Sequence, residues 1–130
     1  VPLLIYQDRL NLLDREPQEN GVTQYCADHG IGFISFSPLA QGLLTDRYLN
    51  GIPADSRMAK EEYLKHSALT PELLERLKKW NAEAAERGET LAEMALAWIL
   101  QQNGVTSVLV GASSVAQLEK NMKCVHAAKL

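Results

Sequence analysis

The sequence lacks the features that would place it among membrane or nucleic-acid-binding proteins. Its longest apolar runs, such as residues 108–110, span only a few residues, whereas a membrane-spanning helix needs about 20. It has no basic excess, because 13 Lys and Arg stand against 16 Asp and Glu and give a net charge of −3. We therefore expect no membrane span and no nucleic-acid partner.

Cysteine and histidine are also scarce. Cys26 and Cys124 lie far apart without metal-type spacing, so we expect two free, buried thiols and a cytoplasmic location. The amino end, residues 1–6, has neither a charged leader nor a small-residue cleavage site and does not resemble a signal peptide. The three histidines are scattered, without further ligands at metal spacing, and no metal site is expected.

What the chain does contain is enough apolar material for a packed core. With 130 residues, 46% of them hydrophobic and 22% charged, it has the size and composition of one globular domain or part of one. It has no internal repeat, low-complexity tract or Pro-rich linker. We find no internal domain boundary.

Strand and helix signals alternate along the chain. Short apolar segments predict strands buried on both faces at 3–6, 31–36 and 105–110. Parallel strands joined by helices indicate the α/β class. Both a closed barrel and an open doubly wound sheet satisfy this pattern, and periodicity does not choose between them.

Each expected helix has an end signal or an apolar face. Helices are predicted to end at Gly30 and Gly88 and to start at Thr70, Thr90 and Ser114. Trp80 and Trp98 recur at helical spacing and are expected in the core. The first and last helices each place apolar or aromatic residues on one face: Val22, Tyr25, Cys26 and His29 in the first, and Val115, Leu118, Met122 and Val125 in the last.

Two loops follow buried strands with small and hydroxyl-bearing residues, at 37–42 and 111–114. Ligands bind at the carboxyl ends of strands in α/β folds, and the second loop also opens a helix whose free backbone donors attract anions. We therefore expect these loops to bind a phosphate group. In the alternative reading, Ser114 and Gln117 form only a capping box. Neither a Rossmann nor a Walker motif is present, since Gly30 and Gly32 precede a strand.

These loops also carry a family resemblance. Segments 37–45, 51–57, 111–113 and 117–121, in this order, resemble the carboxyl-terminal half of an aldo-keto reductase. The sequence of these segments is most similar to the branch of L-glyceraldehyde 3-phosphate reductases and potassium-channel beta subunits. Further resemblance, at Gln7, 11–13 and 95–98, extends it over nearly the whole chain.

The resemblance implies a partial (β/α)8 TIM barrel, with strands six to eight and their helices in residues 1–130. Such a barrel takes about 250 residues, so we expect a fragment. The family's proton-transferring Asp, Tyr, Lys and His lie on earlier strands, so no catalytic residue is assigned here. The implied function is the NADP(H)-binding portion of an oxidoreductase that reduces aldehydes or ketones by hydride transfer. The alternatives are a regulatory module like the channel beta subunits, or an inactive truncated product.

By resemblance, NADP(H) and a small carbonyl compound are the partners, and an open partial barrel is expected to self-associate through its exposed strand edges. The nicotinamide amide would lie at Gln7. The pyrophosphate and the adenosine end would contact the remaining residues: Ser37, Pro38, Leu39 and Gly42 for the pyrophosphate, and Arg57, Gly111, Ser113, Gln117 and Asn121 for the adenosine end.

Two positions depart from the family. Leu10 stands where a tyrosine is expected to stack on the nicotinamide, so it offers apolar contact without a ring face. Ser114 stands where many members carry an arginine, which removes one charge-assisted contact to a 2′-phosphate. The second change lowers the expected preference for NADPH over NADH.

Overall fold

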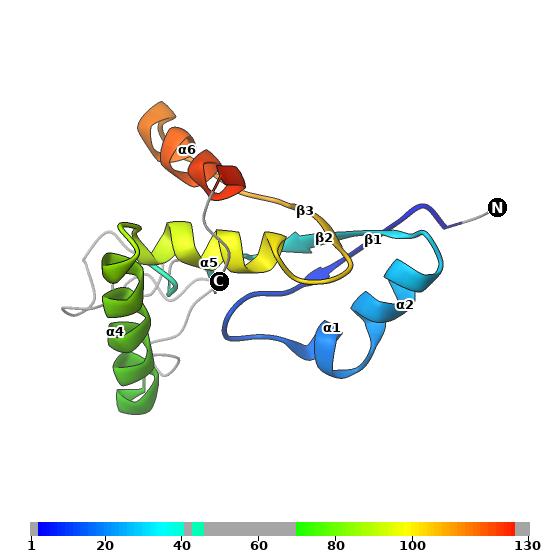
Figure 1. The fold of residues 1–130 in the computed structure, drawn as a ribbon, viewed down its shortest axis with the longest axis horizontal. Helices are drawn as coiled ribbons and strands as arrows, with labels where there is room; N and C mark the ends of the chain where they lie inside the picture. Colours follow the sequence, from blue (N-terminus) through cyan, green and yellow to red (C-terminus); the bar gives the residue numbers. More distant parts are fainter. Residues whose placement is uncertain (1–2, 41–42, 46–69, 127–130) are drawn as a thin grey trace.

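The chain forms a three-stranded parallel sheet flanked by helices (Figure 1). The computed structural model describes residues 3–40, 43–45 and 70–126. The strands lie in the sheet in chain order: β1 (Ile5–Arg9), β2 (Gly32–Phe36) and β3 (Val105–Val108). The predicted α/β class and parallel pairing are confirmed.

Helices follow each strand of the described residues. They are α1 (Glu16–Glu19), α2 (Val22–Asp28), α4 (Pro71–Glu86), α5 (Leu91–Leu100), α6 (Val115–Met122) and the short 3₁₀ helix η4 (Lys123–His126). Only α1 was not expected. It has four residues with Pro17 in its first turn, and so short a polar segment shows no helical periodicity.

The helix ends follow local sequence chemistry. After α2, Gly30 has φ +66° and the Ile31 amide donates to the Cys26 carbonyl at 2.9 Å, a Schellman ending. The hydroxyls of Thr70 and Thr90 each accept from a backbone amide three residues later, both at 3.1 Å. These ends lie where the sequence predicts them.

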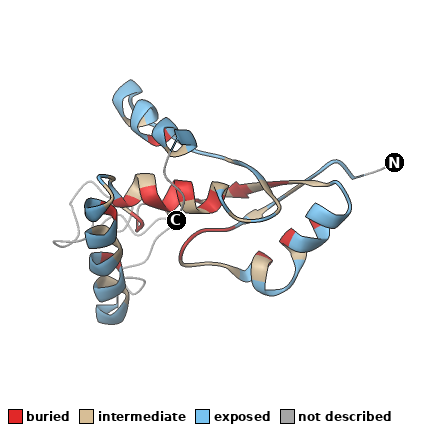
Figure 2. Cartoon of the chain, in the orientation of Figure 1, coloured by how far each residue is buried: buried red, intermediate tan, exposed pale blue. Residues whose placement is uncertain are grey.

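Helix α5 organises the core, as the run of buried residues along it shows (Figure 2). One cluster joins α5 to α4 and to the loops after β1 and β2, and it includes Leu12, Leu44 and Leu77. A second joins α5 to the sheet and α2, with Phe33 and Cys26 at its centre. Both tryptophans are partly buried against these clusters: Trp80 against the first, and Trp98 against both.

The expectation that the strands are buried on both faces is wrong, because none of the three has consecutive buried residues. Ile5 of β1 is 56% exposed, and Leu109, directly after β3, is 48% exposed. These two strands form the edges of the described sheet. The apolar face of α6 is open as well, with Val115 73% exposed and Met122 60% exposed. In the middle strand β2, Phe33 and Ser35 are buried and the other residues are half-buried.

The expected inward face of α2 is also wrong in part. Its buried residues are Thr23 and Cys26, whereas Tyr25 is 58% exposed and stacks on the exposed His29 with ring centroids 3.9 Å apart. Both cysteines are free thiols, Cys26 buried and Cys124 only half-buried. Within the described ranges, no helix has the length and apolar character to cross a membrane.

Candidate functional site

One face of the sheet carries polar and aromatic side chains that the helices do not cover. Side chains alternate along each strand, so Gln7 and Arg9 on β1 share this face with Ile34 and Phe36 of β2, which pair with them in register. Gln7 is exposed, as its expected role requires. The Arg9 guanidinium carbon lies 5.6 Å from the centroid of the half-buried Phe36 ring.

Leu10 belongs to the opposite, covered side. Its side chain is fully buried in the cluster with Cys26, Phe33 and Ile99. It therefore packs the sheet against α2 and α5 and is not accessible to a ligand, which corrects the expectation that it contacts a nicotinamide. The aromatic ring available at this edge is Phe36, one residue before Ser37.

The loop after β2 has an unusual backbone. Ser37 and Ala40 both have positive φ, 50° and 49°, a conformation that costs residues with a side chain free energy and that collects at functional sites. A turn closes between them, since the Ala40 amide donates to the Ser37 carbonyl at 3.1 Å. Pro38 is buried and Leu39 packs on the α4–α5 core. The loop therefore offers backbone groups and the Ser37 hydroxyl.

A buried asparagine holds this loop in place. The Asn11 side chain is 1% exposed, and its Nδ2 donates to the Ser37 carbonyl at 2.9 Å. Its Oδ1 accepts from the amides of Leu13 and Asp14. The Ser35 hydroxyl adds a buried bond of 2.6 Å to the Leu10 carbonyl. The exits of β1 and β2 are thus joined through side chains.

The loop after β3 is built differently, from its own residues. The Leu109 amide donates to the Ser35 carbonyl at 2.9 Å, which keeps the exits of β2 and β3 adjacent. Ser114 caps α6 by accepting from the Gln117 amide at 3.1 Å. The Gln117 side-chain oxygen accepts from the Ser113 amide at 2.7 Å and from its hydroxyl at 3.0 Å. Capping is confirmed, and among the residues that the structure describes the Gln117 Nε2 has no hydrogen-bond partner.

Asn121, near the end of α6, is a buried polar residue. Its side chain is 6% exposed, yet no hydrogen bond of its carboxamide occurs within the part of the chain that the structure describes. Buried polar groups are almost always paired, so an orphaned carboxamide calls for an explanation. It can donate and accept at once, the pattern that an adenine edge presents.

The remaining site residues divide into two groups. Gly111 and Ser113 are exposed, in the loop between β3 and α6. Gly42 and Arg57 lie outside the described residues. Among the residues that are described, no group of three or more His, Cys, Asp and Glu side chains could hold a metal ion.

Two ionisable groups, Tyr6 and Cys124, have a raised pKa. The Tyr6 hydroxyl donates to Asp8 Oδ2 at 3.0 Å, and this bond together with the carboxylate charge raises the pKa of Tyr6. Burial raises the pKa of the Cys124 thiol. Both groups therefore stay protonated and uncharged at neutral pH, and neither supplies a reactive anion.

Comparison with known proteins decides the family. The model of the aldo/keto reductase family matches residues 1–130. The chain belongs to this family. It is 47% identical to the L-glyceraldehyde 3-phosphate reductase of Escherichia coli (strain K12) over 97% of its own length and 38% of the relative's. It is also 38% identical to a probable voltage-gated potassium channel subunit beta of Arabidopsis thaliana, over 94% of this chain and 38% of that protein.

A solved aldo-keto reductase supports the fold. A thermostable aldo-keto reductase crystallised with the inhibitor epalrestat superposes with a TM-score of 0.63 at 23% identity, covering 99% of this chain and 36% of that one. The chain thus spans less than two fifths of the length of these aldo-keto reductase relatives.

Sequence reasoning missed two residues of the site. Asn11 was noted only as part of the family resemblance, and its link to Ser37 joins positions 26 apart, which no local pattern reports. Phe36 was read as a buried strand residue. The alternation that places it beside Arg9 and on the face of Gln7 was the available signal.

Proposed function

We propose that this chain is the NADP(H)-binding portion of an oxidoreductase that reduces aldehydes or ketones to alcohols. The observation that carries the proposal is the buried carboxamide of Asn121, which has no hydrogen bond within the described part of the chain and fits an adenine edge. Family membership and the identity to an L-glyceraldehyde 3-phosphate reductase support it.

The residues present suit a dinucleotide laid across the ends of the three strands. The Ser37 hydroxyl and the backbone of 37–39 would hold the pyrophosphate. Ser113 and the Gln117 Nε2 would contact the adenosine phosphate, with Asn121 at the adenine. Gln7 would hold the nicotinamide amide. Phe36, on the same face of the sheet, would offer the ring that Leu10 lacks.

The bound reduced nicotinamide would supply the hydride. The part of this chain is to fix the position of that ring and to shape the floor of the site through the uncovered sheet face. The Tyr6 hydroxyl already donates its proton to Asp8, and the raised pKa values of Tyr6 and Cys124 make both groups weaker acids. We therefore assign neither of them as the proton donor. By family resemblance, we propose that the proton donor comes from earlier strands of a (β/α)8 barrel to which this chain would contribute strands six to eight.

The test is a titration of the chain with NADPH. We expect saturable binding that Asn121→Ala weakens by about 2- to 13-fold, because an uncharged hydrogen bond to the adenine, worth about 0.5–1.5 kcal/mol, is lost. Asn103 is exposed, lies just before β3 and donates from its side-chain amide to Gln24 Oε1. As a control, Asn103→Ala should leave NADPH binding unchanged. We expect no turnover of methylglyoxal or 4-nitrobenzaldehyde. Equal affinity of the two variants would contradict the adenine assignment.

A second function is favoured by the similarity to the channel beta subunit. A regulatory module would keep the cofactor site but present a docking surface. The exposed apolar face of α6 supports this alternative only weakly, because a completed barrel would cover the same face. Turnover by a chain joined to an amino-terminal barrel half would favour the reductase.

A further inference from the structure

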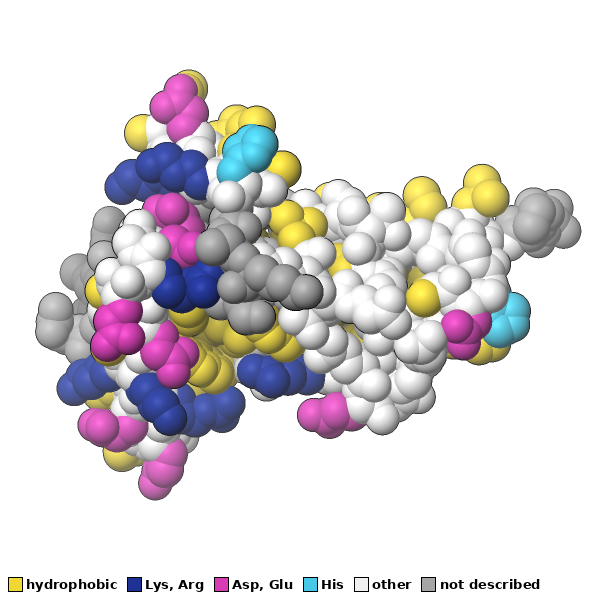
Figure 3. All heavy atoms as spheres, viewed as in Figure 1, with side chains coloured by type: hydrophobic (Ala, Val, Ile, Leu, Met, Phe, Trp, Pro, Cys, Tyr) yellow, Lys and Arg dark blue, Asp and Glu magenta, His cyan; other side chains and the backbone are white. Residues whose placement is uncertain are grey.

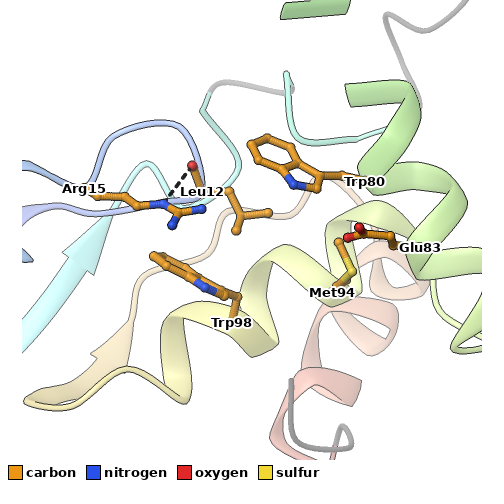
Figure 4. Close-up of a pocket in the computed structure, with 6 residues that line it drawn as sticks. All are labelled: Leu12, Arg15, Trp80, Glu83, Met94 and Trp98. Atoms are coloured by element: carbon orange, nitrogen blue, oxygen red, sulfur yellow. Dashed lines mark hydrogen bonds between the residues drawn. The ribbon is translucent and has the colours of Figure 1, made fainter. Parts of the chain in front are cut away.

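A small pocket lies away from the uncovered sheet face, where α4 and α5 meet the loop after β1 (Figure 4). Its walls are the two indole rings together with an aliphatic and a thioether side chain. The lining residues are Leu12, Arg15, Trp80, Glu83, Met94 and Trp98. The space-filling view shows apolar side chains gathered beside α4 and bordered by charges of both signs (Figure 3).

Two opposite charges face this pocket and do not pair with each other. Figure 4 shows the Arg15 guanidinium entering from the side of the β1 loop and the Glu83 carboxylate from α4. The guanidinium carbon lies 4.6 Å from the Trp98 ring centroid, and Nε donates to the Leu12 carbonyl at 3.1 Å. These two contacts fix the orientation of the Arg15 side chain.

The polar edges of both groups are left without partners in the described residues. The terminal nitrogens of Arg15 make no hydrogen bond there, and the only ion pair formed there joins Arg87 to Glu89. A guanidinium edge held by stacking is pre-organised to bind a carboxylate with two parallel hydrogen bonds. The Glu83 carboxylate is in turn an acceptor for an ammonium group.

The size of the pocket narrows the choice of ligand. Its volume is about 160 Å³. A cavity of roughly 150 Å³ takes a molecule the size of benzene, and pockets for drug-sized ligands start near 300 Å³. A dinucleotide is therefore too large for this pocket, whereas an apolar body of a few carbons fits between the indoles.

We propose that this pocket binds a small zwitterion with an apolar body, such as a free apolar α-amino acid. Arg15 holds the carboxylate, Glu83 holds the ammonium, and Leu12, Met94 and the indoles enclose the hydrocarbon. A simple anion would be repelled by Glu83, and a simple cation by Arg15. The site is separate from the proposed NADP(H) site and does not depend on it.

The two tryptophans of the sequence both line the pocket, so intrinsic fluorescence reports directly on its occupancy. The full chain is titrated with L-leucine, with N-acetyl-L-leucine, which lacks the ammonium, and with L-leucine amide, which lacks the carboxylate. We expect a saturable change with leucine and at least tenfold weaker binding of the two derivatives, because each loses a charge-assisted contact.

Substitutions assign each end of the ligand. Arg15→Gln should weaken leucine at least tenfold and leave leucine amide unaffected, since the amide has no carboxylate to lose. Glu83→Gln should weaken leucine binding at least tenfold and leave N-acetyl-leucine binding unaffected, since that derivative has no ammonium group to lose. Glu83 is exposed, so its substitution tests the proposal even if Arg15→Gln destabilises the fold.

The chain offers matched controls for both substitutions. Arg76 also stacks on a tryptophan, 4.9 Å from the Trp80 ring centroid, but does not line the pocket, and Glu86 lies one turn beyond Glu83 on α4. Arg76→Gln and Glu86→Gln should leave leucine binding unchanged. An unsaturable response to leucine, or equal losses in the controls, would overturn the proposal.

Discussion

The loops that leave β2 and β3 stand side by side but are held by different kinds of contact. The loop after β2 is tied to the exit of β1 by the buried Asn11, whereas the loop after β3 is closed by Ser113 and Gln117, four residues apart. The first is therefore part of the fold's stability, and the second can adapt to a ligand at little cost. Substitutions in the two loops should separate stability from affinity.

The largest expected effect is on the first loop. Asn11→Ala removes three part-buried hydrogen bonds and leaves the amides of Leu13 and Asp14 without their acceptor. We expect a loss of about 3 kcal/mol in the free energy of unfolding, since each unsatisfied buried group costs roughly 1–3 kcal/mol. Asn103→Ala, at an exposed amide, is the control and should change it by less than about 0.5 kcal/mol. Urea unfolding measures both.

An equal, small loss in both asparagine variants would break the comparison, because the loop after β2 would then hold its positive φ angles without Asn11. The Ser37 and Ala40 conformations would have to be stabilised by the turn between them alone.

The sequence predicts the features that depend on contacts between residues close together in the chain, and it misses those that depend on distant residues. The caps at Thr70 and Thr90 and the stop at Gly30 rest on contacts within five residues, and they lie where expected. The exposure of Ile5 on β1 and of Val115 on α6 depends on which elements cover them, which local periodicity does not encode. A strand at the edge of a sheet and a strand in its middle can have the same hydrophobic pattern in the sequence.

The site shows the same division. The two loops after strands could be found by composition, since small and hydroxyl residues follow apolar runs. The orientation of Leu10 into the core and the orphaned state of Asn121 are tertiary facts, set by the packing of α2, α5 and α6. Family resemblance named Asn121, but its burial without a partner is visible only in the structure.

The second prediction concerns affinity through the loop after β3. On a chain completed by its amino-terminal half, Ser113→Ala should weaken NADPH binding roughly tenfold or more, because a hydrogen bond to a charged group contributes about 1.5–3 kcal/mol. Its stability should change little, since Ser113 is exposed. Ser114→Ala should show the reverse, losing about 1 kcal/mol of stability as the α6 cap is removed. Fluorescence titration and thermal unfolding separate the two.

If Ser113→Ala destabilised the chain as much as Asn11→Ala does, the two loops would not differ in kind. If it left NADPH affinity unchanged, the adenosine phosphate would have to lie elsewhere, and the Ser113–Gln117 pair would be a local closure of the loop only.

The smallest expected effect sharpens the comparison at the same loop. Ser114→Arg restores the charge that many family members carry beside a 2′-phosphate, so it should tighten NADPH a few-fold while leaving NADH unchanged. The gain should shrink as salt rises, because an exposed charge pair is screened over about 10 Å at 0.1 M ionic strength. The exposure of Ser114 is what makes screening effective here. Titration of the completed chain with both nucleotides at two salt concentrations measures this. Ser114→Lys, which keeps the charge without the planar fork, should recover only part of the gain. Equal tightening of NADPH and NADH would mean that the added charge acts on the pyrophosphate, and that the 2′-phosphate does not approach this loop.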